Sequence, residues 1–171
     1  MPQIIKHRAV IQDSWQLLEQ ATALPVSGDV IVPYELWVRE RDTLSLRPGR
    51  VGVWLETDAE PEAIAPDLAR IELIAVRFAS ATDGRGYTLA RLLRERYGYR
   101  GELRAIGDVL RDQLYYLSRC GFDAFALRPD QDAEQALAAF DDFSEAYQVS
   151  VERPSPLFRR RLDPESQERP R

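Results

Sequence analysis

The stretch ELIAVRFASATDGRGYTLARLLRERYGYRGELRAI, residues 72–106, decides the fold class. It begins with the nearly continuous apolar run 72–78, which is typical of a strand buried on both faces of a sheet. Residues 86–98 follow, with leucines spaced to share one helical face and with Gly98 as the helix terminator. A second strand is predicted at 101–106. A strand, a helix and a strand joined by short loops predict a parallel βαβ unit.

Strands and helices alternate on both sides of this unit and make about five βα units in all. The other predicted strands are 29–33, 51–56 and 122–127, and the other predicted helices are 34–44, 60–71, 108–121 and 132–147. Five units are too few to close a standard eight-unit barrel. The pattern therefore predicts an α/β fold with a mainly parallel sheet and helices on both faces. An open three-layer sheet is the first choice, and a partial barrel is the alternative.

The two ends of the chain depart from this alternation. Short β-favouring runs around the polar pair Gln12-Asp13 predict an N-terminal β-hairpin within residues 1–20. From residue 148 onward the chain is rich in proline, arginine and glutamate and poor in apolar residues. We therefore expect residues 1–147 to form a single domain and residues 148–171 to be a mobile tail or an arm that becomes ordered on a partner.

Composition excludes several classes of protein. The net charge of −5 repels phosphate backbones, so we expect no nucleic-acid and no membrane partner, although a local basic pocket stays open. One cysteine and one histidine cannot supply a disulfide framework, an iron–sulfur cluster or a histidine-based metal site. No apolar run approaches the ~20 residues that span a bilayer, and the first ten residues lack the apolar core of a secretory signal. We expect a cytoplasmic protein, and we predict no metal and no cofactor.

Two loops at the predicted carboxyl ends of neighbouring strands are candidates for a ligand site. Residues 79–88 follow the strand 72–78, residues 106–109 follow the next strand, and each loop leads into a helix N-terminus that attracts anions. Two glycines permit close approach of the backbone, and Arg85 offers a planar fork of donors. The candidates for binding an oxyanion or a nucleotide phosphate are Asp83, Gly84, Arg85, Gly86, Arg104, Asp108 and Arg111.

A purely structural interpretation of the same loops stays open. The glycines would then shape a tight turn, the aspartates would cap helices, and Arg85 would lie in solvent. The GRG sequence at 84–86 lacks the third glycine of a dinucleotide-binding fingerprint, and no GxxxxGK[ST] phosphate loop is present. Since the carboxylates show no recognisable hydrolase spacing, no catalytic residue is predicted.

Polar residues on the two central helices are candidates for a partner surface. The leucines of 86–98 take the core side, so the arginines of that helix point away from the core, with solvent as their default. Of the 23 basic residues only Lys6 is a lysine, a bias typical of a GC-rich genome that lowers the weight of any arginine cluster. Cys120, at the end of the second helix, is expected to be a buried structural thiol. The partner-surface candidates are Arg91, Arg94, Asp112 and Arg119.

The run DGRGY at 83–87, followed by ARLLRER, GELRAIGDVLRDQ and RCGF, resembles a bacterial family of unknown function encoded beside sulfite reductase. Its members are often labelled as oxidoreductases of sulfite reduction, and the resemblance extends from residue 29 to about 147. It implies a role in assimilatory sulfate or sulfite reduction, with the reductase or its electron donor as a partner. It implies no mechanism, and the sequence contains no redox-centre motif. An accessory binding protein and a small-oxyanion or nucleotide-phosphate binding protein or enzyme both stay open.

Overall fold

The computed structural model describes residues 2–20, 24–143 and 146–162. The strands are β1 (Gln3–Lys6), β2 (Ala9–Gln12), β3 (Gln16–Leu17), β4 (Val30–Pro33), β5 (Val51–Glu56), β6 (Leu73–Phe78), β7 (Glu102–Gly107) and β8 (Ala124–Phe125). The α-helices are α1 (Tyr34–Leu46), α2 (Pro61–Ile64), α3 (Arg85–Glu95), α4 (Leu114–Arg119), α5 (Ala133–Ala136) and α6 (Leu157–Leu162). Three 3-10 turns adjoin them: η1 (Ala65–Asp67), η2 (Arg111–Gln113) and η3 (Leu137–Asp141).

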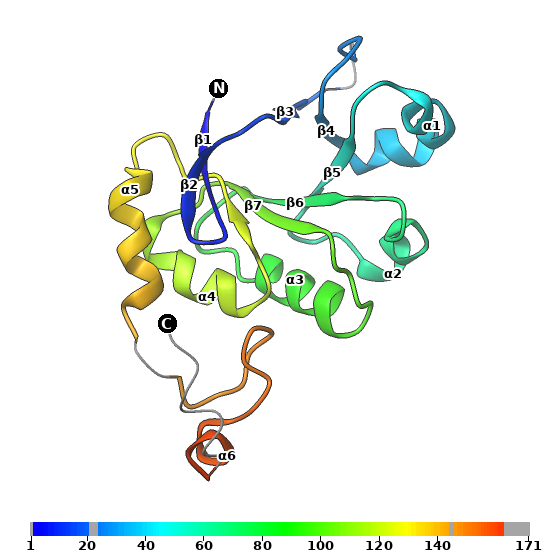
Figure 1. Ribbon diagram of the computed structural model, residues 1–171. Helices are drawn as coiled ribbons and strands as arrows, with labels where there is room; N and C mark the ends of the chain where they lie inside the picture. Colours follow the sequence, from blue (N-terminus) through cyan, green and yellow to red (C-terminus); the bar gives the residue numbers. More distant parts are fainter. Residues whose placement is uncertain (1, 21–23, 144–145, 163–171) are drawn as a thin grey trace.

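The strands form one eight-stranded sheet in the order β2-β1-β8-β7-β6-β5-β4-β3. Neighbouring strands from β3 to β8 are parallel, whereas β1 is antiparallel to both β8 and β2. Each of β4 to β8 is followed by a helix, which confirms the predicted five βα units. The sheet is curled into a half-barrel, so of the two predicted architectures the partial barrel is the one present (Figure 1).

One face of the sheet carries the larger apolar cluster. Apolar side chains of α1 to α5 pack there against alternate residues of the strands, such as Val53, Ile74 and Leu103. Figure 1 shows α3 and α4 lying along this face. Each large apolar side chain buried in this way contributes about 1.5–3 kcal/mol. The predicted leucine face of α3 is confirmed for Leu89 and Leu93, which are both at most 3% exposed, whereas Leu92 of the predicted face is partly exposed.

The opposite, inner face is filled by a crossing segment in place of a second layer of helices. Between β2 and β3 the chain passes from one edge of the sheet to the other, carrying the crossing segment, residues 13–15, over this face (Figure 1). Just after β3, the carbonyl oxygen of Leu18 accepts from Trp54 Nε1 at 2.9 Å, which ties this end of the chain to β5. The inner apolar cluster consists of Trp15, Ile31, Trp54, Leu73, Ala75 and Ile106.

A buried ion cluster lies on the same inner face. The Arg104 side chain is 2% exposed and donates to Asp13 Oδ2 at 2.8 Å and to Glu102 Oε1 at 2.6 Å. Glu102 also accepts from Lys6 Nζ at 2.7 Å. The cluster therefore joins the N-terminal hairpin, the crossing segment and β7.

The hairpin turns earlier than the sequence predicted. Its turn is at His7 and Arg8, whose φ angles are 49° and 62°, whereas in the polar pair Gln12 ends β2 and Asp13 begins the crossing segment. Two positive φ angles make the favoured turn of a two-residue hairpin, but asparagine and glycine are its usual residues, so this sequence carries no signal for it. Asp13 serves instead to accept from the Trp15 backbone N–H at 3.2 Å.

Part of the predicted tail contacts the domain. The Val151 backbone N–H donates to the carbonyl oxygen of Arg119 at 3.1 Å, and Arg119 Nη2 donates to the carbonyl oxygen of Gln148 at 2.9 Å. Ser150 is 7% exposed. Residues 148–153 therefore lie against α4, while the predicted mobility of residues 163–171 falls outside the described residues. None of the helices in the described ranges is long and apolar enough to cross a membrane.

Candidate functional site

The carboxyl ends of β5 and β6 bring Thr57 and Asp83 together, as the parallel sheet requires. Asp83 accepts from Thr57 Oγ1 at 2.5 Å and from Arg85 Nε at 3.0 Å and Nη2 at 2.8 Å. The Arg85 guanidinium, followed by the Thr57 hydroxyl, holds the pKa of the Asp83 carboxyl well below its usual range. Arg85 Nη1 is also 3.3 Å from Asp58 Oδ2. The fork predicted to hold an oxyanion is thus bound by two carboxylates, which repel an incoming anion.

The second predicted loop is tied to the first by side-chain bonds. Asp108 accepts from the Ala81 backbone N–H and from Arg128 Nη1, both at 2.9 Å, and these bonds lower its pKa in that order. Gln113 Nε2 donates to the carbonyl oxygen of Ala81 at 2.7 Å and to the hydroxyl of Tyr87 at 3.2 Å. The loops at the carboxyl ends of β6 and β7 are therefore held together by contacts within the protein.

The other two predicted oxyanion residues lie apart from these loops. Arg104 is in the buried ion cluster of the inner face, where Asp13 and Glu102 occupy its donors. Arg111 Nη2 is 3.2 Å from Asp142 Oδ1, between η2 and the end of η3. The structure therefore brings Asp83, Arg85 and Asp108 to one edge of the sheet but adds neither arginine to them. Among the described residues, no three histidine, cysteine, aspartate or glutamate side chains are arranged to hold a metal ion.

The two glycines of the first loop have different surroundings. A Cβ atom at Gly86 would lie 2.6 Å from the Phe78 ring, whereas a Cβ at Gly84 would meet nothing within 4 Å. Gly84 has a φ of −75°, which any residue can adopt. Gly86 therefore permits helix α3 to pack closely on β6, which is a structural use of glycine.

This difference gives a paired test. We expect Gly86→Ala to lower the free energy of unfolding by about 1–3 kcal/mol, because the added methyl group overpacks against Phe78. Gly84→Ala is the control and should change that free energy by less than ~0.5 kcal/mol. Chemical denaturation of both variants measures the difference. Equal effects at the two positions would contradict the packing role of Gly86.

The four partner-surface candidates divide between the surface and the interior. Arg91 is exposed and paired with Glu95, and Asp112 is exposed. The side chain of Arg94 is only 9% exposed and donates to backbone carbonyl oxygens and to Asp123, so it is not part of the site proposed below. Arg119 borders a cavity that the sequence did not predict.

Cys120 is half-buried at the end of α4. Burial raises the pKa of its thiol, and nearby Arg91 and Arg119 offset this only in part. Since the thiolate is the reactive form, we expect a thiol reagent at pH 7.5 to label native protein at least tenfold more slowly than unfolded protein. Cys120→Ser should fold and lose about 1 kcal/mol. Labelling at equal rates in the two states would show that the thiol is accessible and reactive.

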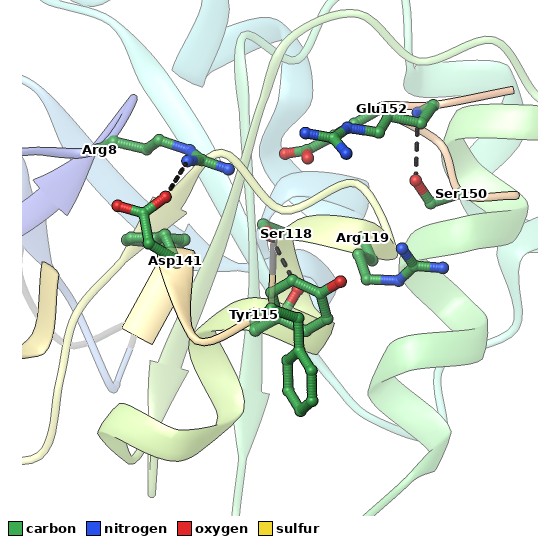
Figure 2. Close-up of a pocket in the computed structure, with 10 residues that line it drawn as sticks. Arg8, Tyr115, Ser118, Arg119, Asp141, Ser150 and Glu152 are labelled. Carbon is green, nitrogen blue, oxygen red and sulfur yellow. Dashed lines mark hydrogen bonds and ion pairs between the residues drawn. The ribbon is translucent and has the colours of Figure 1, made fainter. Parts of the chain in front are cut away.

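The cavity beside Arg119 has a volume of about 490 Å³ and lies between α4, η3 and residues 150–153. Figure 2 shows Arg8 and Asp141 on one side, Arg119 on the other and Tyr115 on α4 below. Arg8 reaches it from the hairpin turn, so four segments distant in sequence form the walls. The lining residues are Arg8, Tyr115, Ser118, Arg119, Phe140, Asp141, Phe143, Ser150, Glu152 and Arg153.

Aromatic side chains form part of the cavity wall and continue beyond it on α4. The Tyr115 ring lies 4.9 Å from the ring of Phe143 and 5.4 Å from that of Tyr116. Tyr116 and Phe143 are each 56% exposed. We call Tyr115, Tyr116 and Phe143 the aromatic face. Of the residues in this region, only Arg119 was among the candidates predicted from the sequence. The spacing of aromatic residues along the chain does not show whether their side chains are exposed.

Comparison with known proteins identifies one family. Residues 52–158 match the family described as a bacterial protein of unknown function (DUF934). The matched range includes the strand-end loops, α4 and residues 148–158, although the predicted domain ended at residue 147. No curated protein and no solved structure matches the chain.

Proposed function

The chain belongs to DUF934, a bacterial family of unknown function, and we propose that it is an accessory binding protein of assimilatory sulfite reduction. In this proposal it docks on sulfite reductase or on the electron donor of that enzyme. The pathway rests on the resemblance of residues 83–122 described above. The binding role rests on the surface of the molecule.

The observation that carries the binding role is the position of the exposed aromatic residues. Among the described residues, every aromatic side chain that is more than half exposed belongs to α4 or to the chain after it. Large exposed apolar patches on a soluble protein mark interaction sites, and aromatic and arginine residues contribute most to binding energy at interfaces. These exposed aromatic residues are Tyr116, Phe143, Tyr147 and Phe158.

The strand-end loops support a small-ligand function less well. Asp58 and Asp83 bind Arg85, and Asp108 and Asp130 bind Arg128. An oxyanion entering there would have to displace carboxylates that already satisfy both guanidinium groups. The cost of that exchange favours a structural role for these ion pairs, which leaves the aromatic face as the better candidate for function.

Gene deletion tests the pathway. A strain lacking the gene should grow poorly with sulfate or sulfite as the sole sulfur source and normally with sulfide, because only the first two sources require the reductase. Normal growth of the deletion strain on sulfate would contradict a role of the protein in this pathway. Restoring the gene in a single copy is the control for effects on neighbouring genes.

Binding is tested with purified sulfite reductase and its electron donor from the same bacterium. The double variant Tyr116→Ser and Phe143→Ser should weaken the complex at least tenfold, because it removes the exposed aromatic surface. The matched control is the double variant Val26→Ser and Leu46→Ser, which removes side chains that are 89% and 86% exposed elsewhere on the molecule. Equal affinity of the two double variants for the partner would show that the aromatic face is not the docking surface.

Calorimetric titration with sulfite, sulfate and phosphate tests the alternative function. Binding of one of these anions, weakened by Arg85→Lys and unchanged by Arg96→Lys, would favour the oxyanion site. Arg96 is a suitable control because it lies just after α3 and pairs with Glu62 at the surface. Absence of binding at millimolar concentration would leave the docking function as the better explanation.

A further inference from the structure

We propose that the partner contributes an acidic peptide segment bearing one large apolar side chain, and that the cavity between α4, η3 and residues 150–153 receives it. The inference rests on the proposed function, since it names the chemistry by which the docking partner is recognised. It is supported by the volume of the cavity, by the apolar side chains that line it and by the charged side chains at its border.

The cavity has room and apolar walls for an anchoring side chain. Its volume of about 490 Å³ lies within the range of pockets that bury a ligand. Phe140, which is 3% exposed, and Tyr115 with the neighbouring Phe143 form the apolar part of the walls. An aromatic or large aliphatic side chain of a partner would bury its surface against these rings.

Arginines border the same walls. The guanidinium carbon of Arg8 lies 5.3 Å from the centre of the Phe140 ring, and that of Arg119 lies 5.6 Å from the centre of the Tyr115 ring. Arg8 contacts Asp141 at 3.4 Å, but both side chains are more than half exposed, and a surface pair of this kind contributes little. Carboxylates next to an apolar anchor would therefore find cationic partners on both sides of the cavity (Figure 2).

The walls of the cavity carry more positive than negative charge within an acidic protein. They contain Arg8, Arg119 and Arg153 against Asp141 and Glu152, whereas the whole chain has 23 basic and 28 acidic residues. This local reversal of charge orients an acidic partner towards the cavity. It does not favour a nucleic acid or an anionic membrane, because the remaining surface repels phosphates.

The negative charge of Glu152 would repel an acidic ligand, so a change at this residue tests the direction in which charge affects binding. Glu152 lines the cavity and is exposed to solvent there. A carboxylate at this place repels the carboxylates of the proposed peptide. Removing its charge should therefore strengthen binding, opposite to the effect of removing an arginine.

Three fluorescein-labelled peptides test the recognition in the full-length protein. The probe is Glu-Glu-Phe-Glu-Glu, and the controls are Glu-Glu-Ser-Glu-Glu, which lacks the anchor, and Lys-Lys-Phe-Lys-Lys, which reverses the charge. We expect fluorescence anisotropy to give a Kd for the probe at least tenfold lower than for either control, with weaker binding at higher salt. Equal binding of the three peptides, or no binding of the probe at millimolar protein, would overturn the proposal. Preference for a single-stranded oligonucleotide of the same charge would overturn it as well.

Variants locate the site. Arg8→Gln and Arg119→Gln should each weaken binding of the probe at least threefold, and Glu152→Gln should strengthen it about twofold. Arg91→Gln is the matched control, since Arg91 is exposed on α3 and pairs with Glu95. Arg119 also holds Gln148, so Arg8→Gln is the decisive variant: a wild-type Kd for Arg8→Gln would place the peptide elsewhere.

Failure of this inference can be separated from failure of the proposed function. If the deletion strain requires sulfide but the protein does not bind the acidic probe, the role in sulfite reduction stands and only the acidic partner is contradicted. If the protein binds the probe as expected but the deletion strain grows normally on sulfate, the peptide-binding surface stands and the role in sulfite reduction is contradicted.

Discussion

Arg104→Met should lower the free energy of unfolding by about 3–5 kcal/mol, the usual cost of removing one partner from a buried ion cluster. The Arg104 side chain is 2% exposed, and the side chains of Asp13 and Glu102 are each 9% exposed. Without the guanidinium group, Asp13 keeps a buried charge but loses its ion-pair partner, and Glu102 loses one of its two cations and keeps Lys6. Urea denaturation with linear extrapolation measures the loss.

Two further variants identify the cause of that loss. Arg111→Met removes an arginine that is 43% exposed and pairs with Asp142, and it should change stability by less than ~0.5 kcal/mol. The triple variant Arg104→Met, Asp13→Leu and Glu102→Leu should recover much of the loss, because it leaves no unpaired carboxylate inside. A loss below ~1 kcal/mol for Arg104→Met alone would contradict the buried cluster.

Arg94→Lys should cost about 3 kcal/mol although it keeps the charge. Arg94 Nη1 donates to the carbonyl oxygens of Tyr99 at 2.9 Å and Gly101 at 2.8 Å, and Nε donates to that of Gly121 at 2.9 Å. Nη2 adds a bond to Asp123 at 2.9 Å. A lysine ammonium cannot reproduce this planar fork, and each buried acceptor left without a donor costs about 1–3 kcal/mol.

The control for Arg94 is on the same helix. Arg91→Lys alters an exposed arginine that pairs with Glu95, four residues later, and should change stability by less than ~0.5 kcal/mol. Thermal unfolding of the two lysine variants against wild type gives the comparison. If both variants unfold at the same temperature, Arg94 does not bridge the helix end and the start of β7 as described.

The alternation of strands and helices was predictable because it depends on local spacing. The apolar run 72–78 and the leucines of 86–98 report which face of each element is buried, and the structure confirms both. The same reasoning placed Arg94 on the outside. Helical spacing gives the direction of a side chain relative to its own helix, but it does not report that the turn at Gly121 lies there to accept its hydrogen bonds.

The candidate site was predictable only in part for the same physical reason. Strand ends in a parallel sheet meet at one edge, so Asp83 and Asp108 were predicted to lie there together. Thr57, which follows β5 and bonds to Asp83, was not among the candidates. Arg104 departs from the prediction because Asp13, which is 91 residues away in sequence, closes over it. The cavity at α4 was missed because Arg8 comes from a hairpin turn that no sequence signal places beside η3.

The position of β1 has a consequence for the order in which the chain acquires its structure on the ribosome. Of the strands within the described residues, β1 is synthesised first and β8 last, yet β1 lies between β2 and β8 in the sheet. The nascent hairpin must therefore wait, with Ile4 and Ile5 uncovered, until nearly the whole domain has emerged. Such long-range pairing slows folding, because the loop-closure entropy is lost before the contacts form. We expect β4 to β7 to assemble first, and the N-terminal hairpin and its crossing segment to close the molecule as the final step, the stage at which a chaperone would bind the newly made protein.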